Sequence, residues 1–508
     1  MTDTTPPRAP LALLVLLQGA VSAASLVVEI VAGRMIAPYV GMSLYSWTAI
    51  IAVVLAGFSV GHWWGGRIAA AASERALRMT GWTMVAAALA TAGATPLLRA
   101  TAGPLLQGLE HPLAAIAALT GAVFFLPSLF AGVPAPVFAV VAMRGRDRSE
   151  QALGAMFAAG AVGAIAGTLL AGFLFVSWLG SVATLAVIAA VYALAAAICF
   201  GLGRANRVQG AAVGAALLAV GGVGGVGLAI DPICDRESSY FCIRTVTMAE
   251  DVPDGPVRMM AIDHLAHGIS AKGDPRVMFT DHAAMLDALP RMRMGGRDFT
   301  SFHIGGGSYS VPRAWTDRGI GGITVAEIDP AVTEQAVADF WFDPAGVRIL
   351  HRDARAALAG EATRYDVVVG DAFTDIAVPA HLVTAEFFAL VASRLEPGGV
   401  FAMNLIDNTG RLDALAAMVE TLRASFASVE VWTEATTPGP NQRRVFVLLA
   451  SDGPSPVGMV AARSPDPKRF AALDAGFIDA IVVRKAPAPL TDDYAPIDRM
   501  LGLEPILD

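Results

Sequence analysis

The chain has 508 residues, of which 55% are hydrophobic and 16% are charged, and its mean hydropathy is +0.57. Because soluble globular domains are close to a quarter charged, this composition excludes a disordered, a fibrous and a wholly soluble single-domain protein. Residues 1–230 carry 11 basic and 6 acidic residues, whereas residues 231–508 carry 25 basic and 38 acidic ones. This division predicts a membrane domain followed by an acidic water-soluble domain, and it argues against a nucleic-acid partner.

Seven apolar stretches in the first part are long enough to cross a bilayer, which takes about 20 residues each. They lie near residues 10–32, 44–66, 79–98, 112–142, 152–178, 181–202 and 209–230. Small residues let helices approach closely in lipid, so glycines four residues apart, as at Gly57, Gly61 and Gly65, predict tight helix packing. We therefore expect an α-helical polytopic membrane domain over residues 1–230, with about seven spans and the lipid bilayer as its partner.

Arginine is concentrated in alternate loops of this domain. The loops after the second, fourth and sixth stretches hold Arg67, Arg75, Arg78, Arg144, Arg146, Arg148, Arg204 and Arg207, whereas the other loops hold Arg34 and Arg99. Basic loops stay in the cytoplasm, so with seven spans the soluble domain would lie outside it. One missed or re-entrant segment would reverse this orientation. Cys234 and Cys242, after the last stretch, fit either a disulfide in an oxidising compartment or two free thiols.

Beyond residue 231 the sequence alternates between strand and helix patterns. Residues 240–247 and 257–262 predict a small β segment, and residues 231–290 form this segment and the linker. The strand-like runs FTSFHIGGG, GITVAEIDP, VRILHRDA, YDVVVGDAF and GVFAMNLID follow, with helical patterns at 331–340 and 382–395 between them. Alternation of this kind predicts a doubly wound α/β, Rossmann-like domain over residues 291–508. Two further runs, 428–433 and 443–450, predict an antiparallel edge.

Four successive strand-like runs end in glycine or in an acidic residue. In chain order these are Gly305, Gly306 and Gly307, then Glu327 and Asp329, then Asp353 and Ala354, and then Asp371, with Asp375 just beyond. Ligands of such sheets lie at the carboxyl ends of the strands, where a glycine turn admits a nucleoside and an acid accepts hydrogen bonds from its ribose. The pattern predicts adenosyl binding. The turn has no P-loop lysine, which argues against ATP hydrolysis.

Residues 236–450 resemble the spermidine synthase family of aminopropyltransferases. The parts that match in order are a β segment (Tyr240–Ile243 and Ile262–Asp263), Asp281, the glycine turn, and the acids that follow the next three strands. The whole chain looks like the multi-pass membrane branch, often called fused transporter/spermidine synthase proteins. This likeness rests on LVVEIVAGRMIAPYVGMSLYSW (26–47), GHWWGGR (61–67), GDAFTDIAVPAHLVTAEFF (370–388) and LTDDYAPIDR (490–499).

The resemblance implies a transferase that moves an aminopropyl group from decarboxylated S-adenosylmethionine to a polyamine-type amine and releases methylthioadenosine. By position, Glu327 would bind the ribose, Asp353 the adenine, and Gly305, Gly306 and Gly307 would line the nucleoside. Asp371 would be the catalytic acid that orients and deprotonates the amine, and Asp281 would help hold the aminopropyl nitrogen. No metal is implied, and a homodimer is left open.

The chain departs from the soluble members where the amine pocket is shaped. Ser308 and Tyr309 follow the glycine triplet in place of Asp-Gly, and Met285 stands near the place of an aromatic residue. The acceptor is therefore left open, as is intact S-adenosylmethionine as the donor, with Arg313 as a candidate partner for its carboxylate. The expected substrate-binding set is Asp263, His267, Asp375 and His381.

Two alternatives remain: a methyltransferase on the same nucleoside site, and a transporter or sensor whose soluble domain only binds a nucleoside or a polyamine. We expect the chain in a bacterial-type inner (plasma) membrane. The arginine pattern favours an extracytoplasmic catalytic domain, whereas supply of a cytosolic sulfonium favours a cytoplasmic one.

Overall fold

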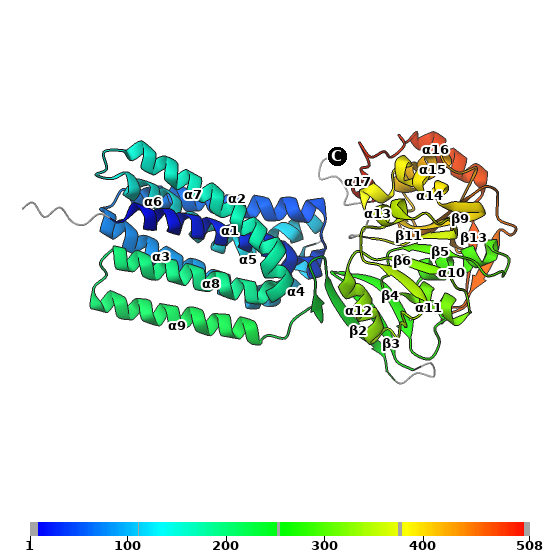
Figure 1. The fold of residues 1–508 in the computed structure, drawn as a ribbon, viewed down its shortest axis with the longest axis horizontal. Coiled ribbons are helices and arrows are strands. Elements are labelled where there is room, and N and C mark those ends of the chain that lie inside the picture. The colour runs from blue at the N-terminus through cyan, green and yellow to red at the C-terminus, as the bar shows by residue number, and fades with distance from the viewer. Residues whose placement is uncertain (1–8, 110, 251–254, 374–377, 502–508) are drawn as a thin grey trace, which may run out of the picture. The chain divides into compact units, whose positions relative to one another are not determined.

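The computed structural model describes residues 9–109, 111–250, 255–373 and 378–501. The chain forms two compact units. The first comprises Met1–Ile233 and Glu237–Cys242, and the second comprises Cys234–Arg236 and Ile243–Asp508. The first unit is helical and the second is a mixed α/β unit (Figure 1).

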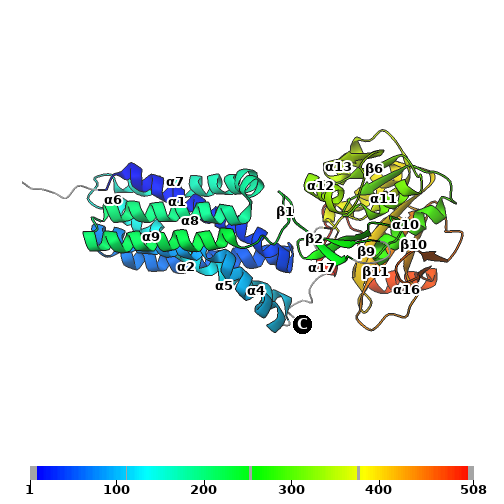
Figure 2. The ribbon, with the colours of Figure 1, turned by 90° about the horizontal axis from the view of Figure 1, so that it is seen from below.

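Helices of the first unit lie alongside one another in a bundle, and α4 bends away from the common direction of the other helices (Figure 2). They are α1 (Leu11–Val40), α2 (Leu44–Ala69), α3 (Ser73–Ala92), α4 (Ala94–Gly108), α5 (Pro112–Gly132), α6 (Pro134–Met143), α7 (Ser149–Leu170), the π-helical turn η1 (Ala171–Phe175), α8 (Val176–Leu202) and α9 (Arg207–Ala229). Five stretches within the described residues are long and apolar enough to cross a membrane, or up to six if α3 and α4, bent by 54°, form one span. One of the five, Ser149–Leu202, covers two of the expected spans, and Gly180 within it has a non-helical backbone with φ 75°. The expected region of several apolar helices is confirmed.

Glycines let the helices of this unit pack at backbone contact, as the sequence predicts. A Cβ atom on Gly61 of α2 would lie 2.1 Å from the carbonyl oxygen of Leu129 in α5, and one on Gly65 would lie 2.3 Å from that of Val133. A Cβ on Gly163 of α7 would lie 2.2 Å from the carbonyl oxygen of Gly19 in α1. No side chain fits at these distances, so these positions require glycine unless the helices separate.

Gly61→Val is expected to lower the melting temperature of the purified chain in detergent, because the added atoms would push α5 away from α2. Overpacking of this kind costs about 1–3 kcal/mol. Gly66→Val is the matched control, since nothing lies within 4 Å of a Cβ atom at exposed Gly66, five residues along the same helix. Equal melting temperatures for the two variants would contradict the close approach of the helices.

Strands of the second unit form two sheets. The four-stranded sheet has the order β1-β2-β3-β4, from β1 (Arg236–Glu237), β2 (Cys242–Ala249), β3 (Val257–Ile262) and β4 (Leu265–Ala271). The nine-stranded sheet has the order β12-β13-β10-β11-β9-β8-β5-β6-β7. Its strands are β5 (Ser301–Ile304), β6 (Ile323–Ala326), β7 (Val347–Leu350), β8 (Tyr365–Gly370), β9 (Leu395–Asn408), β10 (Ser428–Glu434), β11 (Arg443–Ser451), β12 (Met459–Ala462) and β13 (Lys468–Ala472).

Five neighbouring strands, β9, β8, β5, β6 and β7, run parallel, and β11, β10, β13 and β12 continue the sheet with antiparallel pairing. The expected doubly wound sheet, its small β segment and its antiparallel edge are therefore confirmed. The hairpin of β12 and β13, which extends the sheet beyond that edge, was not expected from the sequence.

Helices cover both faces of the large sheet (Figure 1). They are α10 (Asp281–Arg293), α11 (Ser310–Asp317), α12 (Pro330–Asp339), α13 (Ala354–Gly360), the 3-10 turn η2 (Ala380–Leu382), α14 (Ala385–Ser393), α15 (Asp413–Arg423), α16 (Ala475–Lys485) and α17 (Ile497–Leu501). A buried core on one face joins Phe302, Val368 and Phe401 of the strands to Phe387 of α14 and Leu415 of α15. Side chains alternate along a strand, so Asn404 of β9 points to the other face, which α10 covers.

Candidate active site

The order of the parallel strands reverses at β5, which lies between β6 and β8. Strand pairing places the residues that follow these strands side by side. The amide of Gly305 donates to the carbonyl oxygen of Ala326 at 2.9 Å, and the amide of Asp371 donates to that of Ile304 at 3.0 Å. Open α/β sheets bind ligands at such a switch point, outside the carboxyl ends of the strands.

Glu327 holds the glycine turn from the end of β6. Its Oε2 accepts from the amide of Gly306 at 2.8 Å, and its Oε1 accepts from the amide of Asp329 at 3.0 Å. The side chain is 6% exposed, and burial raises the pKa of its carboxyl although these amides oppose the shift. Each carboxylate oxygen has a second lone pair, so Glu327 can still accept hydrogen bonds from a ribose diol.

Asp371 follows β8 and is held by Asn404 of β9, whose Nδ2 donates to Asp371 Oδ1 at 2.8 Å. Burial raises the pKa of the Asp371 carboxyl, with His282 and Asn404 acting in the opposite direction. Asn404 is 3% exposed, and its Oδ1 has no hydrogen-bond partner within the described residues. A buried acceptor of this kind is costly unless a ligand satisfies it, so the amide fits a ligand N–H beside Asp371.

Three histidines lie on the β4 and α10 side of Asp371. Burial lowers the pKa of His267 to about 4, with further contributions from His282 and His264, so its imidazole is neutral at pH 7. Burial also lowers the pKa of His264, and Arg443 and Arg244 add to that effect. No group of three or more His, Cys, Asp or Glu residues in the described ranges is arranged to hold a metal ion.

The backbone of β4 touches the glycine turn. A Cβ atom on Gly307, where φ is 51°, would lie 2.5 Å from the carbonyl oxygen of His267. A Cβ atom on Gly305, where φ is 90°, would lie 2.8 Å from the carbonyl oxygen of Asp371. The turn therefore needs glycine both for its backbone conformation and for the close approach of two neighbouring segments.

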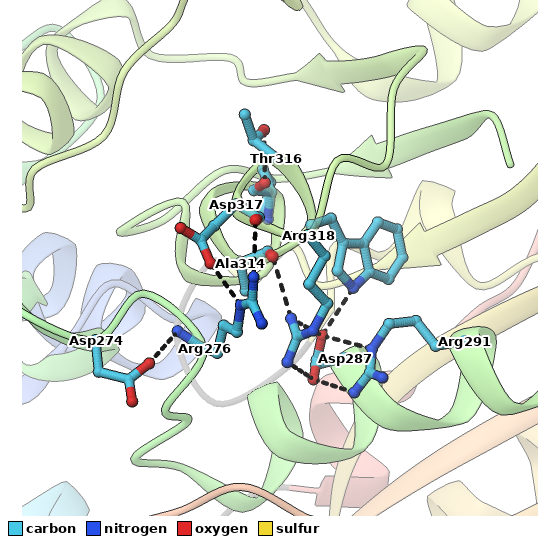
Figure 3. Close-up of polar contacts among 10 residues, drawn as sticks. Asp274, Arg276, Asp287, Arg291, Ala314, Thr316, Asp317 and Arg318 are labelled. Atoms are coloured by element: carbon cyan, nitrogen blue, oxygen red, sulfur yellow. Dashed lines mark hydrogen bonds and ion pairs between the residues drawn. The ribbon is translucent and has the colours of Figure 1, made fainter. Parts of the chain in front are cut away.

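Helix α10 carries Asp281 and His282 at its start and is anchored further along by Asp287. The Asp287 carboxylate, 2% exposed, accepts from Arg291 at 2.6 Å, from Arg318 at 3.0 Å and from Trp315 Nε1 at 2.8 Å (Figure 3). A buried charge with this many donors fixes the helix firmly against α11. Asp281 Oδ1 accepts from Nζ of Lys468 in β13 at 2.6 Å.

The acidic residues that follow β6 and β7 also cap helices. The Asp329 side chain accepts from the amide of Ala331 at the start of α12, and Asp353 accepts from the amide of Ala356 at the start of α13. Asp353 Oδ2 also lies 2.7 Å from His381 Nε2. Burial would raise the pKa of Asp353, but the hydrogen bonds from Ala356 and His381 outweigh it and lower this pKa.

The remaining predicted residues are distributed as follows. Ala354, the first residue of α13, is buried in the core, and Asp263 is buried in the turn between β3 and β4 with φ 51°. Arg313 donates to the carbonyl oxygens of Ala271 and Lys272, and so its guanidinium is already engaged by the backbone. Asp375 lies outside the described residues.

Sequence reasoning missed three residues of this site: His282, Asn404 and Lys468. Asn404 had a usable signal, because a polar residue inside the apolar run of β9 needs a partner. His282 follows Asp281 directly, but its sequence context shows only a helix start. Lys468 is 187 residues from Asp281 along the chain and lies outside residues 236–450, which resemble the spermidine synthase family.

No family model matches the chain. It is 30% identical over 200 residues to a probable polyamine aminopropyl transferase of Bifidobacterium longum, covering 36% of this chain and 44% of that protein. It is 30% identical over 239 residues to a polyamine aminopropyltransferase 2 of Streptomyces coelicolor, covering 44% and 40%. It is also 30% identical over 175 residues to an N-terminal histidine N-methyltransferase of Emericella nidulans, covering 33% and 30%. The chain spans less than half the length of each of these relatives.

Among solved structures, a probable spermidine synthase from Corynebacterium glutamicum is similar, with 19% identity and a TM-score of 0.42, over 50% of this chain and 94% of that one. The sequence matches are the stronger finding, and two of the relatives named above are polyamine aminopropyltransferases. The chain therefore has spermidine synthase-like homologues and, with its several apolar helices, is compatible with a fused membrane form of them.

Proposed function

We propose that the second unit transfers an aminopropyl-type group from decarboxylated or intact S-adenosylmethionine to an amine and releases methylthioadenosine. One observation carries this proposal: the Asp371 carboxylate lies at the switch point of the sheet, beside the glycine turn and bonded to Asn404. A carboxylate beside a nucleoside site suits deprotonation of an amine, and burial makes it a better base than an exposed aspartate.

The residues present fit each part of the reaction. Glu327 and the glycine turn would hold the nucleoside, whose sulfonium supplies an electrophilic carbon. The lone pair of the amine forms the new N–C bond, and the C–S bond breaks with its electron pair remaining on sulfur. The proton of the resulting ammonium group passes to Asp371, which Asn404 Nδ2 keeps in place. Asn404 Oδ1 can accept a second N–H of the same amine.

Product analysis tests the proposal. The purified full chain in detergent is incubated with each donor and a panel of amines, and the nucleoside products are separated by mass spectrometry. We expect methylthioadenosine together with an alkylated amine. S-adenosylhomocysteine would instead support the methyltransferase candidate, which the similarity to a histidine N-methyltransferase favours as the second choice. No methylthioadenosine with either donor would refute the proposal.

We also infer that the second unit lies on the extracytoplasmic side of the membrane. Seven crossings result if the α3–α4 pair is counted as one span and Ser149–Leu202 is divided at Gly180. The arginine-rich loops then lie on the same side of the membrane as the N-terminus. Cys234 and Cys242, which follow the last helix, are both disulfide-bonded, whereas Cys199 is free. Disulfides persist in oxidising compartments, which supports the same orientation. A donor made in the cytosol would then have to cross the bilayer.

Reporter fusions are expected to show this orientation. Alkaline phosphatase fused at Ile233 or at the C-terminus should be active, and a fluorescent protein that folds only in the cytosol should remain dark there. The same fluorescent protein fused after Arg204, in the loop between α8 and α9, should be bright. Alkylation of Cys234 and Cys242 should require prior reduction. Fluorescence at the C-terminus would contradict the orientation.

A further inference from the structure

Lys468 and Asp281 form an ion pair at the start of α10. Lys468 Nζ lies 2.6 Å from Asp281 Oδ1 and 3.9 Å from Glu434. The side chains are 36% and 27% exposed, and the hydrogen bond with Asp281 raises the pKa of Lys468, which therefore stays charged. Ion pairs this exposed contribute about 0–1 kcal/mol to stability. The pair therefore contributes little to the stability of the fold, and both of its charged groups remain accessible to a ligand.

The position of the pair connects it to the reaction. Asp281 is the residue before His282, which acts electrostatically on both Asp371 and His267. The β12–β13 hairpin that carries Lys468 is tied to the segment before α10, since the amide of Met278 donates to the carbonyl oxygen of Arg463 at 2.9 Å. Arg463 also forms an ion pair with Asp274. Lys468 is therefore held beside the start of α10, where the second residue of the helix, His282, acts electrostatically on Asp371.

The charged groups around the start of α10 are of both signs, as the recognition of a zwitterion requires. Asp281 has an ammonium partner in Lys468, and Glu434, at 3.9 Å, and Asp466 also act electrostatically on that ammonium group. The other groups near Asp371 on this side are imidazoles, His267 and His282, and His264 with its neighbour Arg443 lies next to them. An adjacent carboxylate and ammonium are complementary to the ammonium and carboxylate of an amino acid.

We propose that the donor is intact S-adenosylmethionine, with its α-ammonium group on Asp281 and its α-carboxylate on Lys468. This proposal rests on the proposed function and names its donor. The group transferred is then 3-amino-3-carboxypropyl. The N–C bond forms to its terminal carbon, the C–S bond breaks with its electron pair going to sulfur, and the amine proton goes to Asp371. Methylthioadenosine remains the by-product, as with the decarboxylated donor.

Equilibrium binding to the full chain in detergent tests the donor. By calorimetry, we expect the native chain to bind intact S-adenosylmethionine about tenfold more tightly than the decarboxylated form. Lys468→Gln should remove this preference by weakening binding of the intact donor about tenfold, and it should bind the decarboxylated form as well or better because Asp281 is freed. Lys468→Arg should keep the preference. The mass of the alkylated amine reports the same choice during turnover.

Lys485→Gln is the matched control. Lys485 pairs with Asp413 at 2.7 Å, with 28% and 30% exposure, and Asp413 starts α15, which packs on the opposite face of the sheet from α10. This variant should lose as much melting temperature as Lys468→Gln and keep the native donor preference. Tighter binding of the decarboxylated donor by the native chain, or an unchanged ratio in Lys468→Gln, would overturn the proposal. Methylthioadenosine release would still support the proposed function in that case, and its absence with both donors would refute the function itself.

Discussion

Asp371→Asn is expected to lower kcat by about 10²–10⁴-fold, the usual contribution of a positioned general base. The amide that replaces the carboxylate cannot take the proton of the attacking amine. It keeps the size of the side chain at the end of β8, and the contacts of Gly305 and Glu327 do not involve its charge. Donor affinity should therefore stay within about threefold of the native value. Single-turnover assays of methylthioadenosine and calorimetric donor titrations measure the two quantities separately.

Asp366→Asn is the control for this change, because Asp366 lies at the other end of the same strand. It binds Thr300 and Arg297 there, at the edge away from the glycine turn. That variant should lose some stability and retain kcat. If Asp371→Asn retains kcat, or if it loses donor binding as severely as turnover, Asp371 is not the base.

The pH dependence of kcat provides a second readout of the same residue. Burial raises the pKa of Asp371, and the group must be ionised to accept a proton. Activity should therefore fall as the pH is lowered through this raised pKa, at a higher pH than an exposed aspartate would give. Asn404→Ala removes a hydrogen bond that stabilises the ionised form, so it should move the acid limb further upward.

The sequence was sufficient to predict which strand ends come together. Gly305, Glu327 and Asp371 each follow a short apolar strand, and parallel strands of a doubly wound sheet end on the same edge. These residues lie close together because of the order of the strands alone, and the backbone hydrogen bonds between the segments follow from that order. The same reasoning placed Asp353 at this edge, but it could not show that the carboxylate caps α13 and binds His381.

The features of the site that the sequence did not predict depend on contacts between segments that are distant along the chain. Lys468 reaches Asp281 through a hairpin that pairs with β10, outside the pattern of strands and helices that predicted the sheet. Asn404 reaches Asp371 because β9 lies next to β8, so its partner depends on strand register. Register and pairing of this kind come from tertiary packing, which neither local propensity nor motif spacing describes. The ammonium group that pairs with Asp281 therefore could not be located from the sequence.

Glu327→Gln is expected to weaken donor binding by about 10²-fold. Both oxygens of the native carboxylate accept backbone hydrogen bonds, from Gly306 and from Asp329, and we propose that the same oxygens accept from the ribose diol. A glutamine keeps one acceptor and replaces the other with an NH₂ group, which faces a backbone N–H instead of accepting from it. Hydrogen bonds to charged groups are worth about 1.5–3 kcal/mol each, so the loss of one or two gives a change of this size.

Glu361→Gln is the matched control for the buried charge. Glu361 is also 6% exposed and binds Arg348 and Tyr365 at the end of α13 away from Asp353. Both variants should lose melting temperature, but only Glu327→Gln should lose donor affinity in calorimetric titrations. Burial raises the pKa of Glu327, so native affinity should also fall as the pH is lowered through that pKa, because protonation removes a ribose acceptor. If Glu327→Gln keeps native affinity, the donor's ribose is held elsewhere, and the nucleoside does not lie on the glycine turn.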